Sequence, residues 1–381
     1  MNCVLCGKND KEILFKLSSN MKILSPAFKK SETFLVNCNC CGNTFVDIDA
    51  TQNDFNDYYK SESARSLSYY EVYGEKASDM YFTDVLNNFR SYISKDSAII
   101  DVASGVGDFS CFLNKNGYKN VTALDISERC IKSLDEKNIK SIHSDIAHID
   151  SSEHGKYDVA VLLHSLEHFL DFKSCLEAVK KIVKPNGVIY IETPDASKYC
   201  DVDAVPFTFF TYEHTFHLTQ DTMKNIGCVC GLECVNTGSF FKADSYWVVY
   251  GVFINEGAYK EPFYTDTTKL AISKYIDFSR NLLKKRLPKS TETKYYLWGI
   301  GASTALLLSD TFDDYNIIGL IDRNPARQGL EYKIHDNNLV VQTPDAITDK
   351  EAVILVLPYW YKDSILKQIK DMKIENPVKV L

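Results

Sequence analysis

The sequence of 381 residues lacks three features that would each point to a class of function. No apolar run approaches the roughly 20 residues that cross a bilayer, so no membrane span is expected. Basic residues are not in excess, because the formal net charge is −8, whereas a general nucleic-acid binder usually carries a basic patch. The first residues have neither the charged nor the apolar region of a signal peptide. We therefore expect a cytoplasmic protein without a nucleic-acid partner.

Disulfide bonds are not expected either, although the chain has 12 cysteines, because cytoplasmic thiols stay reduced. The cysteines crowd the N-terminus as two Cys-x-x-Cys pairs, which are Cys3 with Cys6 and Cys38 with Cys41. Four thiolates give Zn²⁺ a closed tetrahedral shell, which leaves no position for water and is typical of a structural site. Cys40 is an alternative to Cys41, but Gly42 suits a knuckle turn after Cys41 and favours that cysteine.

The chain is predicted to have four parts. A zinc module with a connecting helix spans residues 1–73, an α/β core spans 74–257, a linker helix spans 258–288, and a smaller α/β domain spans 289–381. Most tyrosines of the connecting helix are expected to pack against the core. One or two could instead reach over a cofactor or substrate, the candidates being Tyr58, Tyr59, Tyr69, Tyr70 and Tyr73.

Within the core, short apolar strands alternate with amphipathic helices, which predicts a parallel sheet with ligands at the carboxyl ends of its strands. The expected strands span residues 98–102, 121–125, 140–143, 159–163 and 188–192. Two later strands, at 233–236 and 246–254, have no helix between them and are expected to be antiparallel.

The turn after the first strand lacks the third glycine of a dinucleotide-binding turn. It reads Ala103-Ser104-Gly105-Val106-Gly107, and Asp101 precedes it at the strand end. Glycines allow the backbone to approach a ligand, and Asp125, at the end of the next strand, can accept hydrogen bonds from ribose hydroxyls. Both acids would be costly endings for apolar strands without a polar ligand. The pattern therefore favours a nucleoside-containing cofactor other than NAD.

These strand ends resemble those of class I S-adenosylmethionine-dependent methyltransferases, whose first motif is usually acid-x-Gly-x-Gly-x-Gly, with Ala103 here at the first glycine. The resemblance implies that Asp125 holds the ribose and that Asp145 and Ile146 face the adenine. It implies a set of cofactor-binding residues: Asp101, Ala103, Ser104, Gly105, Gly107, Asp125, Ile126, Asp145, Ile146 and His164. Glu167 and His168 also match a family element, with either a helix-start role or a contact to the methionine moiety.

The densest titratable cluster outside the metal module runs from Tyr212 to His217, between the fifth strand and the next helix. A methyltransferase must position an acceptor and remove its proton, which a histidine or glutamate of tuned pKa can do. Tyr212, Glu213 and His214 are therefore the candidate catalytic residues. The alternative is that Glu213 and His214 only brace the loop.

The last part of the chain repeats the strand and glycine-turn pattern. Trp298-Gly299-Ile300-Gly301 leads into a helix start, and a second strand ends at Asp322, followed by Arg323-Asn324-Pro325. With the zinc module and the core, these marks resemble the sugar C-methyltransferase family over nearly the whole chain. The implied fold is a class I methyltransferase Rossmann-like core with a four-cysteine zinc module and a smaller C-terminal Rossmann-like domain.

That resemblance implies a nucleotide-linked keto-deoxysugar as substrate, bound between the core and the C-terminal domain. A base removes a proton next to the ketone, and the enolate takes the methyl group from S-adenosylmethionine. Aligning Glu213 and His214 on the family's Tyr-His-Glu-His stretch places Thr211 at the tyrosine position and Tyr212 at the first histidine. Two alternatives stay open: O- or N-methylation of a nucleotide sugar or glycan precursor, and a scaffold that binds cofactor or nucleotide without turnover.

Overall fold

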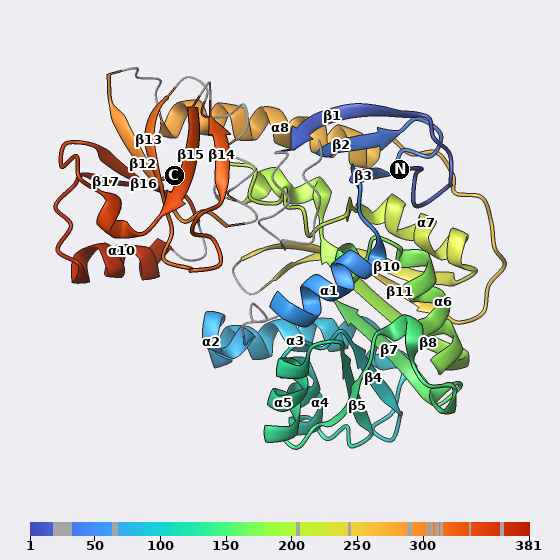
Figure 1. Ribbon diagram of the computed structural model, residues 1–381. Helices are drawn as coiled ribbons and strands as arrows, with labels where there is room; N and C mark the ends of the chain where they lie inside the picture. The colour runs from blue at the N-terminus through green and yellow to red at the C-terminus, as the bar shows by residue number, and fades with distance from the viewer. Residues whose placement is uncertain are drawn as a thin grey trace.

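The computed structural model describes residues 1–17, 33–62, 68–202, 206–242, 245–287, 292–301, 304, 308, 312, 315–334, 337–358 and 362–381. Its strands form three sheets, which belong to the N-terminal, central and C-terminal parts of the molecule (Figure 1). Among the helices of these residues, none combines the length and apolar character needed to span a bilayer.

The central sheet has seven strands in the order β10-β11-β8-β7-β4-β5-β6. Their bounds are β4 (Ile99–Val102), β5 (Val121–Asp125), β6 (Lys140–His143), β7 (Tyr157–Leu163), β8 (Val183–Pro194), β10 (Glu233–Lys242) and β11 (Tyr246–Ile254). Strands β4 to β8 are parallel, and β11 runs antiparallel to both β8 and β10. The predicted antiparallel pair is therefore confirmed, and the carboxyl ends of β4, β5, β6 and β7 meet at one edge.

Helices cover both faces of this sheet because successive strand side chains point to opposite sides. Ile99 packs with residues of α3 and α4, whereas Ile100 packs with residues of α6 and α7. The helices of this region are α3 (Glu75–Phe89), α4 (Asp108–Lys115), α5 (Glu128–Glu136), α6 (Phe172–Ile182) and α7 (Gln220–Cys230).

The N-terminal sheet contains β1 (Lys11–Leu17), β2 (Thr33–Cys38), β3 (Thr44–Asp47) and β9 (Phe216–His217). The last of these strands comes from the central part of the chain: Thr44 pairs with His217, and Phe45 pairs with Phe216. The boundary predicted at residue 73 therefore does not separate this sheet from the core. A two-residue strand carries no periodicity, so its pairing could not be seen in the sequence.

The segment predicted as one connecting helix differs in the structure. It contains α1 (Gln52–Glu62) and the short α2 (Tyr69–Tyr73), while residues 63–67 lie outside the described residues. Gly74, with φ +78°, separates α2 from α3. The position of α1 matters for function, because it places one helix of the N-terminal module against the edge of the central sheet (Figure 1).

The C-terminal sheet has six strands in the order β14-β15-β13-β12-β16-β17. Their bounds are β12 (Lys294–Trp298), β13 (Asn316–Ile321), β14 (Glu331–Ile334), β15 (Asn337–Gln342), β16 (Val353–Val356) and β17 (Val378–Val380), and α10 (Lys362–Asp371) follows β16. The expected linker helix is α8 (Thr267–Arg286), which lies along both the first and the last sheet in Figure 1. Its Ile272 and Leu283 share an apolar cluster with Leu35 and Leu297, so α8 is a packed element that joins these parts.

Candidate active site

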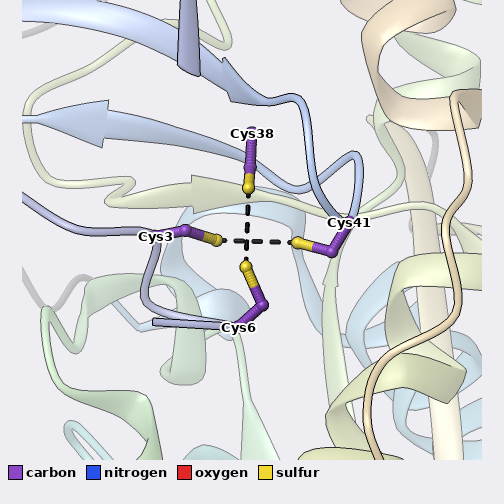
Figure 2. Close-up of side chains that lie close together, drawn as sticks. All are labelled: Cys3, Cys6, Cys38 and Cys41. Carbon is purple, nitrogen blue, oxygen red and sulfur yellow. Dashed lines mark hydrogen bonds between the residues drawn. The ribbon is translucent and has the colours of Figure 1, made fainter. Parts of the chain in front are cut away.

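The four cysteines predicted as metal ligands come together between the N-terminal loop and the turn after β2 (Figure 2). The Sγ atoms of Cys3 and Cys41 lie 3.6 Å apart, and those of Cys6 and Cys38 lie 3.5 Å apart. Sulfurs at about 2.3 Å from a tetrahedral zinc would be about 3.8 Å apart, so this donor set fits Zn²⁺. Cys40 is exposed and stands outside the cluster, which agrees with the choice of Cys41.

Both knuckles turn on a glycine in the left-handed region. Gly7 has φ +74° and donates its backbone N–H to the carbonyl of Cys3, and Gly42 has φ +77° and donates to the carbonyl of Cys38. A Cβ on Gly42 would lie 1.5 Å from the carbonyl oxygen of Thr265, just before α8. The second knuckle therefore holds the chain that enters α8 as well as the metal ligands.

The turn after β4 has three residues in the left-handed region: Ala103 (φ +55°), Gly105 (φ +56°) and Gly107 (φ +82°). At Ala103 this conformation costs about 1 kcal/mol, which the surrounding contacts must offset. A Cβ on Gly107 would lie 2.2 Å from the Cδ2 atom of Leu134, so close packing of α5 requires the glycine. The turn brings backbone N–H groups close to the end of β5.

Asp125 is fixed at the edge of a cavity by two backbone donors. Its Oδ2 accepts from the N–H of Gly105 at 2.8 Å, and its Oδ1 accepts from the N–H of Ser127 at 2.9 Å. Burial raises the pKa of this carboxyl above its ordinary value. The arrangement presents a carboxylate of fixed orientation to a ligand, as ribose recognition requires.

The cavity beside Asp125 has a volume of about 180 Å³. Seven of the predicted cofactor-binding residues line it, namely Ala103, Gly105, Asp125, Ile126, Asp145, Ile146 and His164. Three others do not. The Oδ2 atom of Asp101 instead accepts from the hydroxyl of Ser110 at 2.8 Å, and burial raises its pKa to about 7. The backbone N–H of Ser104 donates to the carbonyl of Leu124, and Gly107 is the residue before α4. Both residues therefore shape the turn without lining the cavity.

Helix α1 supplies residues to this cavity that were not among the predicted cofactor-binding residues. Gln52, Asn56 and Tyr59 line it, and their spacing places them on one face of the helix. The Nδ2 atom of Asn56 donates to Asp145 at 2.8 Å, and the hydroxyl of Tyr59 lies 2.7 Å from Nδ1 of His168. The signal available in the sequence was this polar spacing, together with the alternative that one or two tyrosines reach over a ligand.

A second, larger cavity of about 600 Å³ lies between the central and C-terminal parts. Glu213 and His214 line its central side, and the glycine turn after β12 lines the other side together with Asp322, Arg323 and Arg327. The hydroxyl of Tyr58 donates to Oε1 of Glu213. Two of the three predicted catalytic residues therefore face a cleft of substrate size.

Tyr212, the third, is fully buried in the apolar cluster that contains α8 and does not line either cavity. Tyr212 points away from the cavity that Glu213 and His214 line, because successive residues of this loop face different sides. The loop itself is held by the N–H of Thr215, which donates to the carbonyl of Glu167 at 2.7 Å.

The linings of the two cavities are in contact at His168 and His214. His168 lines the smaller cavity and His214 the larger one, and their ring centroids are 5.0 Å apart. Burial, and after it the neighbouring His168, lowers the pKa of His214 well below its ordinary value. The imidazole of His214 is therefore neutral near pH 7.

A buried polar network behind this junction was not predicted. Nε2 of His164 lies 3.1 Å from Oε1 of Glu192, and the hydroxyl of Tyr190 donates to Oε2 of Glu192 at 2.9 Å. Lys242 donates to the hydroxyls of Tyr69 and Tyr246 at 2.9 Å each, and burial lowers its pKa to about 7. Since His164 lines the smaller cavity and Tyr246 the larger one, this network supports both walls.

Residues 73–237 match the model of a family described as "Methyltransferase domain". A ubiquinone biosynthesis O-methyltransferase of Hydrogenovibrio crunogenus is 32% identical over 29% of this chain and 47% of its own length. Protein arginine N-methyltransferase 2 of Dictyostelium discoideum is 27% identical over 35% of this chain and 27% of its own length. The chain thus spans less than half the length of these curated relatives.

Among solved structures, 1,6-didemethyltoxoflavin-N1-methyltransferase of Burkholderia thailandensis, with bound S-adenosylhomocysteine, is similar at 13% identity and a TM-score of 0.41. The match covers 56% of this chain and 96% of that one. The family match and the strand order of the central sheet together show that the central part has the class I methyltransferase fold. The matched range ends before β11 and does not include the C-terminal sheet.

Proposed function

We propose that this protein, whose central part is a class I methyltransferase domain, transfers a methyl group from S-adenosylmethionine to a nucleotide-linked keto-deoxysugar. One observation carries the proposal: the cavity in the cofactor position and the larger cleft lie side by side, because His168 of the first lining contacts His214 of the second. A donor in one cavity and an acceptor in the other would face each other across that contact.

The smaller cavity fits the adenosyl part of the donor. Asp125 would accept hydrogen bonds from the ribose hydroxyls, and Asp145, held by Asn56, would face the adenine beside Ile146. Ala103 and Gly105 allow the backbone of the turn to approach the ligand. The donor supplies an activated methyl group, and these residues bind and orient it.

The larger cleft fits a nucleotide-linked sugar. Arg323 and Arg327 provide cationic groups for a diphosphate, whereas Phe209 and Trp298 provide apolar surface. On the opposite wall, Glu213 or His214 would remove a proton from the carbon next to the ketone. The electron pair of that C–H bond would pass to the ketone oxygen, and the enolate carbon would then take the methyl group as the sulfur–methyl bond breaks.

O- or N-methylation of a nucleotide sugar or glycan precursor is the second candidate. It is favoured by Thr211 and Tyr212, which stand where the sugar C-methyltransferases have a tyrosine and a histidine. It also agrees with the two curated relatives, whose names specify O- and N-methyl transfer. The binding of donor and acceptor would be the same in both candidates, and the atom that loses a proton would differ.

The four cysteines are proposed to hold a structural Zn²⁺. No position in a four-thiolate shell is left for substrate. The cluster packs next to β3, which pairs with β9 just after His214, so the metal would stabilise the loop of the larger cleft. Metal analysis of the purified protein tests this role, with loss of zinc from a Cys38→Ser variant as the expected result.

The decisive experiment is mass spectrometry of products formed from labelled S-adenosylmethionine and a panel of nucleotide-linked keto-sugars. A methylated sugar with deuterium exchange next to the ketone indicates carbon transfer, whereas a product without exchange indicates O- or N-transfer. Binding of S-adenosylmethionine without a product from any acceptor would favour a non-catalytic scaffold and contradict the proposed enzyme.

A further inference from the structure

We propose that Glu167, His168 and His214 form a second metal site, which holds a divalent transition-metal cation at the junction of the two cavities. The site stands on the geometry of these three residues. Its role, which is to bind an oxygen of the methyl acceptor, rests on the proposed function.

The donor atoms of these residues already lie close together. One ligand atom from each is within 4.8 Å of the others. In the part of the chain that the structure describes, the four-cysteine cluster is the other group that meets this condition. A small movement of side chains would bring two imidazole nitrogens and one carboxylate oxygen to the roughly 2.0–2.2 Å bonds of a zinc ion.

The carboxylate of Glu167 is buried without a hydrogen-bond donor in the described part of the chain. Its side chain is 1% exposed, and neither carboxylate oxygen has a hydrogen-bond donor among the described residues. Nδ1 of His164 lies 3.5 Å from Oε1, but the two atoms do not form a hydrogen bond. A buried carboxylate without a partner is costly, and a bound cation would offset that cost.

The two histidines are prepared for ligation. The hydroxyl of Tyr59 contacts Nδ1 of His168 at 2.7 Å, which orients the ring and leaves Nε2 for a metal, as outer partners of metal-bound histidines do. His214 is half-buried, and its ring centroid lies 5.0 Å from that of His168.

Local structure fixes the ligands relative to one another. Glu167 and His168 lie on a 3-10 turn, Leu166–His168, directly after β7. Thr215, next to His214, donates both its N–H and its hydroxyl to the carbonyl of Glu167, at 2.7 and 3.0 Å. The two ligand segments are therefore joined by their backbones, without the help of a metal.

The donor set indicates the kind of metal and its use. Two imidazoles with one carboxylate are typical of sites that leave a coordination position open for water or substrate. The open position would face the cleft beside Glu213, where an acceptor oxygen could bind. A cation there stabilises negative charge on that oxygen, and Glu213 receives the proton that the acceptor loses.

Cobalt titration of the full-length, zinc-loaded protein tests the site without any methyl acceptor. We expect one equivalent of Co²⁺ to bind with a visible spectrum that lacks the sulfur-to-cobalt charge-transfer band of a thiolate site. Glu167→Gln and His214→Asn should abolish this binding, while His154→Asn, at an exposed histidine outside both cavities, should bind cobalt normally.

Tyr59→Phe provides a milder test, because it removes only the hydroxyl that orients His168. It should weaken cobalt binding by roughly 10- to 100-fold, as the loss of an outer partner does elsewhere. This variant also serves if either ligand variant fails to fold, which circular dichroism would reveal.

Two results would overturn the proposal: cobalt that binds only with a thiolate spectrum, or equal binding by wild type, Glu167→Gln and Tyr59→Phe. The outcome is separate from that of the proposed function. Cobalt binding without transfer to any sugar would leave the metal site and remove the proposed activity, whereas transfer by a protein that binds no cobalt at these residues would leave the activity and remove the metal site.

Discussion

The two glycine turns of this molecule hold the acid of the next strand through the same pair of backbone hydrogen bonds. After β4, the N–H of Gly105 donates to Oδ2 of Asp125 at 2.8 Å, and after β12 the N–H of Ile300 donates to Oδ2 of Asp322 at 2.8 Å. In both, the other carboxylate oxygen accepts from the N–H two residues further on, at 2.9 and 2.8 Å. A strand, a glycine turn and an acid at the end of the next strand thus produce the same anchoring of the acid twice.

What surrounds the two carboxylates is different. Asp125 is buried beside Ile126, Ile146 and the residues of α1, in a cavity of about 180 Å³. Asp322 is half-buried, and the cavity beside it has about 600 Å³ and contains Arg323 and Arg327. Each turn provides a fixed carboxylate, while the neighbouring elements set the size and the charge of the cavity beside it. Under the proposed function, the first cavity takes the adenosyl group and the second takes an anionic acceptor.

The largest expected difference between the turns is in stability. Gly107→Ala places a Cβ in contact with Leu134 and keeps a residue at φ +82°, so the free energy of unfolding should fall by about 2–4 kcal/mol. In Gly301→Ala the new Cβ would meet, among the residues that the structure describes, only Oγ1 of Thr304, at 3.8 Å, so the change should stay within about 0.5 kcal/mol. Urea unfolding measures both, and equal losses would contradict the comparison.

The second difference is a buried acid in the strand before the first turn. Asp101 lies four residues before Gly105, whereas the equivalent position, four residues before Ile300, is Tyr296. Because the folded pKa of Asp101 is raised to about 7, the folded state keeps a proton that the unfolded state has already lost. Stability should therefore fall as pH rises from about 4 to 7, by at most about 1.4 kcal/mol per pH unit.

Asp101→Asn should remove this pH dependence. Without S-adenosylmethionine, urea unfolding at pH 5 and pH 8 should show the variant gaining stability relative to wild type at the higher pH. An unchanged difference between the two proteins at both pH values would show that Asp101 is ionised without cost in the fold.

Substitution of Asp125 and substitution of Asp322 should each weaken the binding of a different ligand. Asp125→Asn is expected to weaken S-adenosylmethionine binding by about 10- to 100-fold, since hydrogen bonds to a charged group contribute about 1.5–3 kcal/mol. Asp322→Asn should instead weaken the binding of uridine or thymidine diphosphate. Isothermal titration of each variant with each ligand measures this, and a variant that weakens both equally would mean that the cavities are not independent.

The smallest effect is expected at Arg323, which is exposed at the edge of the larger cavity. Arg323→Gln should weaken nucleoside diphosphate binding by about 3- to 10-fold at low salt, and the difference should shrink at high salt because exposed charges are screened. Arg90→Gln, at an exposed arginine outside both cavities, is the matched control. Binding of S-adenosylmethionine should be unchanged in both variants.

Much of the fold could be predicted from periodicity and spacing. Strands β5, β6 and β11 have the bounds expected from their apolar patterns, and the four cysteines meet as their spacing requires. Seven cofactor candidates line one cavity because parallel strands bring their carboxyl ends to the same edge. Tyr212 and Asp101 did not reach the cavities, since adjacency in sequence does not decide which way a side chain points.

The sequence by itself determined the strand ends, the two glycine turns with their acids and the four-cysteine cluster, because these depend on local spacing. Only the tertiary structure decided that Asn56 and Tyr59 of α1 complete the smaller cavity, and that β9 joins the N-terminal sheet. It alone placed Glu167 and His168 beside His214. These contacts join residues far apart in the chain, and they form through packing of whole elements, which leaves no periodic signal in the sequence.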